Sequence, residues 1–382
     1  MANRTKRIFI SDIHMGDKRS TTNNNYGWFK KNIHVLTRFL DDQLKATDVK
    51  ELVILGDLFD TWVIPAKTDA LTDFADICDN SANVPVIDNL KKLADPSCEI
   101  KLAYVPGNHD MGMNVKGISE TKLFIETTFP GIRVICDNIV PWGVYNVGIL
   151  AAEHGNHYCL FNAPDIWQPN KDFLPLGYFI SRAVAGATSN YYDILVKFLK
   201  DVMDHDNIVR DLFDAIAADA GLKPDGTIKL IDAKNIKLPG YPDTLTIDDI
   251  GQRFSNLFQN WNDTPGNCEA IAAAGNDLGN LLPAAKWAYF DHSNTNIVIF
   301  GHTHHSDLVP QDLDPNADPS THPADTPWHH IYANCGTWID KSKNGCTYVE
   351  TEEDAKKERH YVRLKSYTKE GAALIREEFV KL

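Results

Sequence analysis

The stretch NIVIFGHTHH, residues 296–305, ends a fully apolar run in three histidines. Four earlier stretches also end an apolar run in carboxylate, amide or imidazole side chains: RIFI (7–10) before Asp12 and His14, LVIL (52–55) before Asp57 and Asp60, IKLAYV (100–105) before Asn108 and His109, and VGILAA (147–152) before His154. Continuous apolar runs of this length are typical of strands covered on both faces. The pattern predicts an α/β fold around a buried sheet.

The segment IHVLTRFLDDQL lies between the first two runs and has a helical pattern. Its apolar residues Ile33, Leu36, Leu40 and Leu44 recur at helical spacing. A strand, helix, strand order predicts parallel neighbours, and parallel sheets place their sites at the carboxyl ends of the strands. All five polar groups follow such ends, so we expect them to converge in space.

Composition limits the class of protein. The 382 residues are 43% hydrophobic and 24% charged, as in a soluble globular protein, and the net charge of −14 argues against binding to nucleic acid. The seven cysteines are scattered singly, which indicates neither a disulfide framework nor a thiolate zinc site. The N-terminus lacks a signal-peptide core, and no apolar run is long enough to span a bilayer. We therefore expect a cytoplasmic protein.

The pattern changes between about residues 160 and 292. Segments such as NYYDILVKFLKDVM and TIDDIGQRFSNLF have helical spacing, so we expect a largely helical insertion that caps the site within one domain of residues 1–382. Residues 310–328, rich in Pro and Asp, are predicted to form a long loop. The tail segments HHIYANCGTWID, CTYVET and RHYVRLKSY are predicted to be strands that return to the sheet.

Each polar group taken alone has a simpler interpretation. Gly-Asp commonly closes a strand, GNHD is compatible with a turn, and His154 is compatible with a buried core histidine. Their conjunction favours a metal site, because mixed carboxylate, imidazole and amide ligands suit Mn, Fe or Zn. Two ions about 3.5–4 Å apart need a shared carboxylate, for which Asp57 is the candidate, and such a pair lowers the pKa of a bound water.

Five motifs together resemble the signature of the calcineurin-like metallophosphoesterases: Asp12-x-His14, Gly56-Asp57-x-x-Asp60, Gly107-Asn108-His109-Asp110, His154, and Gly301-His302-x-His304. The resemblance implies a four-layer α-β-β-α sandwich with two metal ions at one end, Mn being expected, with Fe or Zn as alternatives. It implies that one ion is held by Asp12, His14, Asp57 and His304, and the other by Asp57, Asn108, His154 and His302. His109 would protonate the leaving oxygen, and Asp60 would orient it.

The resemblance implies a hydrolase of phosphate esters in which a metal-bridging hydroxide attacks phosphorus in line. We expect a small-molecule phosphodiesterase or phosphomonoesterase. A pyrophosphohydrolase is the alternative, because SDIHMGD and GDLFDTW are similar to segments of UDP-2,3-diacylglucosamine hydrolases. A non-catalytic binding scaffold on the same fold is an alternative of another class. Asn108, Asn156, His157 and Arg19 are candidate contacts to the substrate phosphate.

Overall fold

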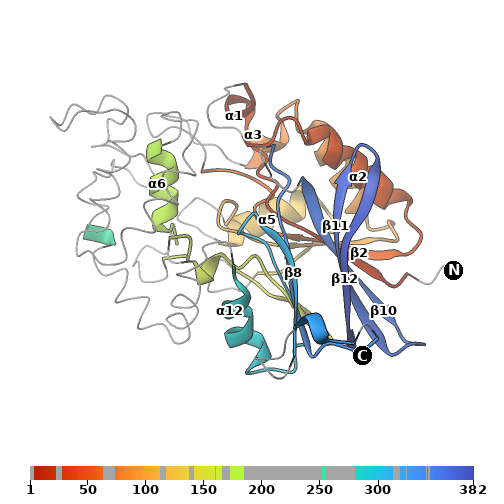
Figure 1. The fold of residues 1–382 in the computed structure, drawn as a ribbon. Coiled ribbons are helices and arrows are strands. Elements are labelled where there is room, and N and C mark those ends of the chain that lie inside the picture. Colours follow the sequence, from red (N-terminus) through yellow and green to blue (C-terminus); the bar gives the residue numbers. More distant parts are fainter. Residues whose placement is uncertain are drawn as a thin grey trace.

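The computed structural model describes thirteen parts of the chain: residues 4–22, 28–62, 74–111, 118–136, 142–159, 161–165, 173–184, 252–254, 280–312, 319–323, 325–340, 342 and 345–382. These residues form two sheets with short helices on their outer faces (Figure 1). Among the described helices, none is both long and apolar enough to cross a membrane. The six cysteines in these residues are free thiols.

The first sheet has seven strands. Their order is β12 (Gly371–Lys381), β11 (Arg359–Thr368), β10 (Cys346–Asp354), β1 (Lys6–Ile10), β2 (Val49–Leu55), β3 (Lys101–Val105) and β4 (Arg133–Val134). The strands from β1 to β4 pair in parallel, which confirms the prediction from the strand, helix, strand order. The tail strands β10, β11 and β12 pair antiparallel, and β12 was not predicted.

The second sheet has five strands. Their order is β5 (Tyr145–Val147), β6 (Leu150–Ala152), β7 (Ile297–Phe300), β9 (His330–Cys335) and β8 (Ser306–Gln311). The central strands β6, β7 and β9 are parallel, so the segments after β6 and β7 leave the sheet at the same edge. The edge strand β8 contains Pro310, a residue that edge positions tolerate because it lacks an N–H.

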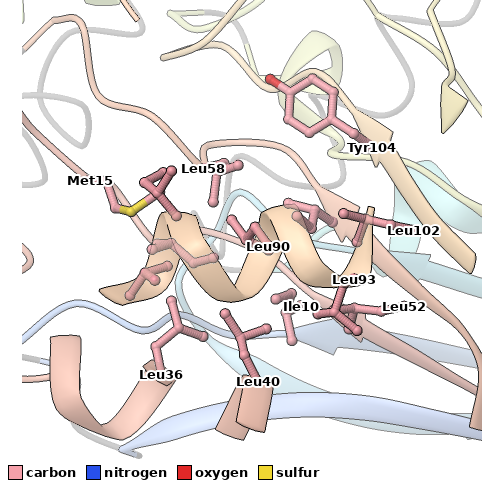
Figure 2. Close-up of a cluster of buried hydrophobic side chains, with 14 of the residues drawn as sticks. Ile10, Met15, Leu36, Leu40, Leu52, Leu58, Leu90, Leu93, Leu102 and Tyr104 are labelled. Atoms are coloured by element: carbon pink, nitrogen blue, oxygen red, sulfur yellow. The ribbon is translucent and has the colours of Figure 1, made fainter. Parts of the chain in front are cut away.

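Alternating side chains of the first sheet fill two separate cores. Ile8 and Ile10 of β1 face the helices α2 (Ile33–Lys45) and α4 (Val84–Leu93), whereas Phe9 between them packs against the second sheet. Figure 2 shows Leu90 and Leu93 of α4 among strand and α2 side chains. Successive strand residues point to opposite faces, and here both faces are buried, which explains the continuous apolar runs.

The second sheet is covered on its outer face by a third core. Val298, Phe300 and Tyr332 pack there against Tyr158 and the helical segments α12 (Leu282–Ala285) and Lys286–Phe290, the latter a π-helix. Figure 1 shows α2 on one side of the sheets and α12 on the other. The layers are therefore helix, sheet, sheet, helix, as the resemblance implied.

The remaining described elements are short. They are α1 (Lys18–Thr22), α3 (Phe74–Cys78), α5 (Ile118–Thr128), α6 (Leu176–Val184) and the 3₁₀ turns Asn156–Tyr158 and Pro319–Thr321. Of the expected insertion at 160–292, α6 and α12 are helical, and most of the rest lies outside the described residues, so its role as a cap stays a prediction. In the segment 310–328, β8 extends to Gln311 and the 3₁₀ turn follows.

Candidate metal centre

The site is formed by the turns that follow the parallel strands, and these turns are strained. Within the described parts of the chain, seven non-glycine residues have a positive φ, and five of them are predicted ligands: Asp12 (54°), His14 (57°), Asp57 (52°), His302 (68°) and His304 (59°). A left-handed backbone costs a non-glycine residue on the order of 1–3 kcal/mol and is concentrated at functional sites. The strain is therefore gathered where the predicted ligands lie.

Two glycines of the motifs allow the turns to approach one another closely. A Cβ at Gly56 would lie 2.5 Å from Nδ1 of His154, and Gly56 itself has φ of +78°. A Cβ at Gly107 would lie 2.2 Å from Oδ1 of Asp57. Gly56 and Gly107 are thus required by contact between the β2, β3 and β6 turns, and Gly56 also by its left-handed backbone.

The first cluster combines Asp12, His14 and His304, whose ligand atoms lie within 4.8 Å of one another. The Nε2 atoms of the two histidines are 3.0 Å apart, and Asp12 Oδ1 lies 3.3 Å from Nε2 of His304. Oδ1 is buried without a hydrogen bond to a described residue, whereas Oδ2 accepts the backbone N–H of His302. Two imidazole nitrogens and a carboxylate oxygen that face one another suit a cation.

The second cluster combines Asp57, His154 and His302. His154 donates Nδ1–H to the carbonyl of Leu55 at 2.7 Å, and its Nε2 lies 3.0 Å from Oδ1 of Asn108 and 3.2 Å from Oδ2 of Asp57. Burial lowers the pKa of His154, but the charge of Asp57 raises it to about 10 overall. The environment therefore favours positive charge at this nitrogen, and a bound metal would replace the proton.

Asp57 lies between the two clusters. Its Oδ2 is 3.7 Å from Nε2 of His14 and 3.2 Å from Nε2 of His154. Its Oδ1 accepts the backbone N–H of His109 at 2.8 Å, which fixes the carboxylate. Burial raises the pKa of Asp57, but the neighbouring His154 and His109 lower it well below its usual value. One ionised oxygen thus faces both clusters.

Asp60 joins His14 to His109. Its Oδ1 lies 3.0 Å from Nδ1 of His109 and its Oδ2 lies 3.2 Å from Nδ1 of His14. Because an ionised carboxylate only accepts, both Nδ1 atoms carry hydrogen, which leaves Nε2 of His14 available to a metal. Burial lowers the pKa of His109, but Asp60 and then Asp57 raise it above its ordinary value overall. His109 therefore keeps a proton readily, as a general acid must.

Two further polar residues hold the turns together. Asp110 is fully buried and accepts the N–H groups of Gly107 at 2.7 Å and Leu58 at 2.8 Å, which ties the β3 turn to the β2 turn. Asn334 of β9 donates to the carbonyl of Gly301 at 2.7 Å and so supports the turn that carries His302 and His304.

The three other candidate phosphate contacts have partners away from the clusters. Asn156 donates to the carbonyl of Asn162, and Nε2 of His157 lies 3.5 Å from Glu153 while its ring stacks on Trp142 at 5.0 Å. Arg19 donates to Asp17 at 2.6 Å. Asn108, the fourth candidate, lies in the second cluster, with Oδ1 3.0 Å from Nε2 of His154.

Two aromatic residues of the site, Trp62 and Trp28, were not predicted from the sequence. Trp62 stacks on His109, with ring centroids 4.1 Å apart and planes at 25°. Trp28 lies against His14, His109 and His304. Trp62 directly follows the GDLFDT segment, so its position along the chain was a usable signal, whereas nothing near Trp28 in the sequence indicates its contacts.

Comparison with known proteins gives one strong match. The family model for calcineurin-like phosphoesterases matches residues 5–306, and no curated protein matches the chain. A solved structure of nuclease MPE from Pseudomonas putida is 16% identical over 39% of this chain and 53% of its own, with a TM-score of 0.22. Vps29 from Chaetomium thermophilum is 8% identical over 99% of this chain and 97% of its own, with a TM-score of 0.33. These scores are too low to carry an argument about function.

Proposed function

Because the chain belongs to the calcineurin-like phosphoesterase family, we propose that it is a dinuclear metal-dependent hydrolase of small-molecule phosphate esters. The observation that carries the proposal is the position of Asp57 Oδ2, 3.7 Å from Nε2 of His14 and 3.2 Å from Nε2 of His154. A carboxylate oxygen shared between two groups of imidazoles is what a pair of ions about 3.5–4 Å apart requires.

The proposed ligand sets are those that the family resemblance implies, and the two clusters support them. Asp12, His14, Asp57 and His304 would hold one ion, and Asp57, Asn108, His154 and His302 the other. Nitrogen and oxygen donors without thiolates fit Mn, with Fe or Zn as alternatives. When bound, the ions would supply an activated water and neutralise the phosphate oxygens. The strained turns keep the ligand atoms in place before binding.

His109 is proposed to donate the proton that the leaving oxygen needs. Asp60 holds its Nδ1–H at 3.0 Å, so the second ring nitrogen, Nε2, is the one that presents the transferable proton. Trp62, stacked at 4.1 Å, fixes the plane of the imidazole. General acid catalysis by a positioned histidine contributes on the order of 10²–10⁴ in rate.

The proposed substrates are small phosphate monoesters or diesters. A nucleotide-sugar or lipid-linked pyrophosphate is the alternative substrate, and a scaffold that binds a partner without catalysis is the alternative of another class. Metal content and substrate preference distinguish these three hypotheses. A scaffold needs no bound metal and turns over no ester, and a pyrophosphohydrolase cleaves pyrophosphates in preference to simple esters.

The test is a hydrolysis screen with added Mn²⁺ over monoesters, diesters and nucleotide-sugar pyrophosphates, together with metal analysis. Asp57→Asn should abolish turnover and reduce the content of both metals, because a neutral amide cannot balance two cations. Asp88→Asn, an exposed carboxylate change on α4, is the matched control and should behave as wild type. Normal turnover and two retained ions in Asp57→Asn would contradict the assignment.

A further inference from the structure

Trp28 lies beside three histidines that come from three separate parts of the chain. Its ring centroid is 4.8 Å from that of His14, 5.8 Å from that of His109 and 5.9 Å from that of His304. The indole and His304 are half-buried, whereas His14 and His109 are buried. Part of the Trp28 side chain is therefore accessible to solvent beside these histidines.

The backbone of Trp28 is fixed by contacts to Asp340, which lies between β9 and β10. The N–H of Asp340 donates to the carbonyl of Trp28 at 2.9 Å. Its carboxylate accepts the N–H groups of Lys30 at 3.1 Å, Lys31 at 2.8 Å and Asn32 at 3.1 Å. A carboxylate at this point, directly before α2, is also stabilised by the helix dipole. A ring that is already held in place loses little freedom when a ligand packs on it.

The position of Trp28 relative to His109 indicates which part of a substrate it meets. This step rests on the proposed function, in which His109 protonates the leaving oxygen. Atoms attached to that oxygen must then lie near His109, where Trp28 is the half-buried ring. Trp62 also contacts His109, but it is only 1% exposed, so it positions the imidazole and does not meet the substrate.

We propose that Trp28 is a specificity-determining residue that stacks on a planar aromatic leaving group of the phosphate ester. An indole face favours a flat π system over a puckered ring of the same size. Stacking of a nucleobase on an aromatic side chain, measured by alanine substitution, corresponds to roughly 5- to 150-fold in binding. Simple aryl groups and nucleobases share this chemistry.

The test compares esters that differ in planarity and little else. The leaving groups of benzyl phosphate and cyclohexylmethyl phosphate are both primary alcohols. The corresponding methyl diesters are used if the protein prefers diesters. Binding of benzylphosphonate and cyclohexylmethylphosphonate to the Mn²⁺-loaded protein, followed by calorimetry, gives a readout that does not depend on turnover. Adenosine 5′-phosphate against ribose 5-phosphate distinguishes a nucleobase from a simple aryl group.

The wild-type protein should favour the planar member of each benzyl pair about five-fold or more in kcat/KM and in affinity. Trp28→Leu should remove this preference while the metal content stays unchanged, and Trp28→Phe should retain most of it. Asp340→Ala, which removes the described contacts to the N–H groups of Lys30, Lys31 and Asn32, should weaken the preference. Trp287→Leu is the matched control, because that half-buried ring contacts only His292 among the described rings.

Two results would overturn the inference while the proposed function stands: an equal loss of both esters in Trp28→Leu, or an unchanged preference in that variant. A merely structural role of Trp28 gives the first of these. If the Mn²⁺-loaded wild type hydrolyses no ester, including the activated p-nitrophenyl ester, both the proposed function and the inference are wrong.

Discussion

Replacing Asp60 with asparagine should produce two separable defects, because this carboxylate orients two histidines with different proposed roles. Asp60 accepts from Nδ1 of His109 at 3.0 Å and from Nδ1 of His14 at 3.2 Å. Asparagine has a single acceptor oxygen, and its NH₂ group faces an Nδ1–H that it cannot bind. One of the two imidazoles therefore loses its partner in the variant.

The size of each defect follows from the hydrogen bonds that are lost. A hydrogen bond to a charged group contributes about 1.5–3 kcal/mol, which is roughly 10- to 150-fold in an equilibrium or a rate. Loss of the hydrogen bond to His14 should weaken metal binding by about 10- to 100-fold, as is typical when a residue that orients a metal ligand is replaced. Loss at His109 should slow esters whose leaving group needs a proton by a similar factor.

The assay measures kcat/KM for an alkyl ester and for the p-nitrophenyl ester as Mn²⁺ is raised. Saturating Mn²⁺ should restore kcat/KM for the p-nitrophenyl ester, because p-nitrophenolate leaves without a proton. The alkyl ester should still be hydrolysed slowly. Asp88→Asn on the surface of α4 should show neither defect. An equal loss of both esters that persists at saturating Mn²⁺, or no loss of either, would refute the double role of Asp60.

Three other perturbations test separate parts of the account. His109→Asn should slow alkyl esters by on the order of 10²–10⁴ and the p-nitrophenyl ester little; loss of a metal in this variant would make His109 a ligand. Gly56→Ala should lower the free energy of unfolding by at least about 1–2 kcal/mol, because φ is +78° and the new Cβ meets His154. If this variant unfolded in urea at the same concentration as the wild type and kept its metal content, the reasoning would be contradicted. His360 is buried, and burial lowers its pKa to about 4. Between about pH 6.5 and pH 4 the unfolded chain therefore binds a proton that the folded chain does not. The free energy of unfolding should decrease by up to about 3 kcal/mol as the pH is lowered through this range. His360→Gln should flatten that part of the pH–stability curve in urea unfolding, and an unchanged slope would contradict the reasoning.

The strands and the meeting of the motif residues could be predicted from the sequence because both depend on local patterns. Ile8, Phe9 and Ile10 form a continuous apolar run, since helices cover one face of β1 and the second sheet covers the other. Parallel strands then bring their carboxyl ends to one edge, so Asp12 and Asp57 meet although they are far apart in the sequence.

Features that depend on contacts distant in sequence were not predicted. β12 begins with the apolar run Ala372–Ile375, but these side chains are exposed and the strand is held by its pairing with β11, so it was not predicted. Trp28 reaches the histidines because Asp340 holds its backbone, and no local pattern records that pairing. His157 lies two residues after Gly155, whose backbone is left-handed (φ of +97°), and it pairs with Glu153, a contact that no local pattern indicates; its role as a phosphate contact stays a prediction.

The central claim is that Asp57 bridges two metal ions, and the most direct test is anomalous diffraction from crystals grown with Mn²⁺. We expect two anomalous peaks about 3.5–4 Å apart, one among Asp12, His14 and His304 and the other among Asn108, His154 and His302, with the Asp57 carboxylate between them. A single peak, or two peaks without Asp57 between them, would contradict it.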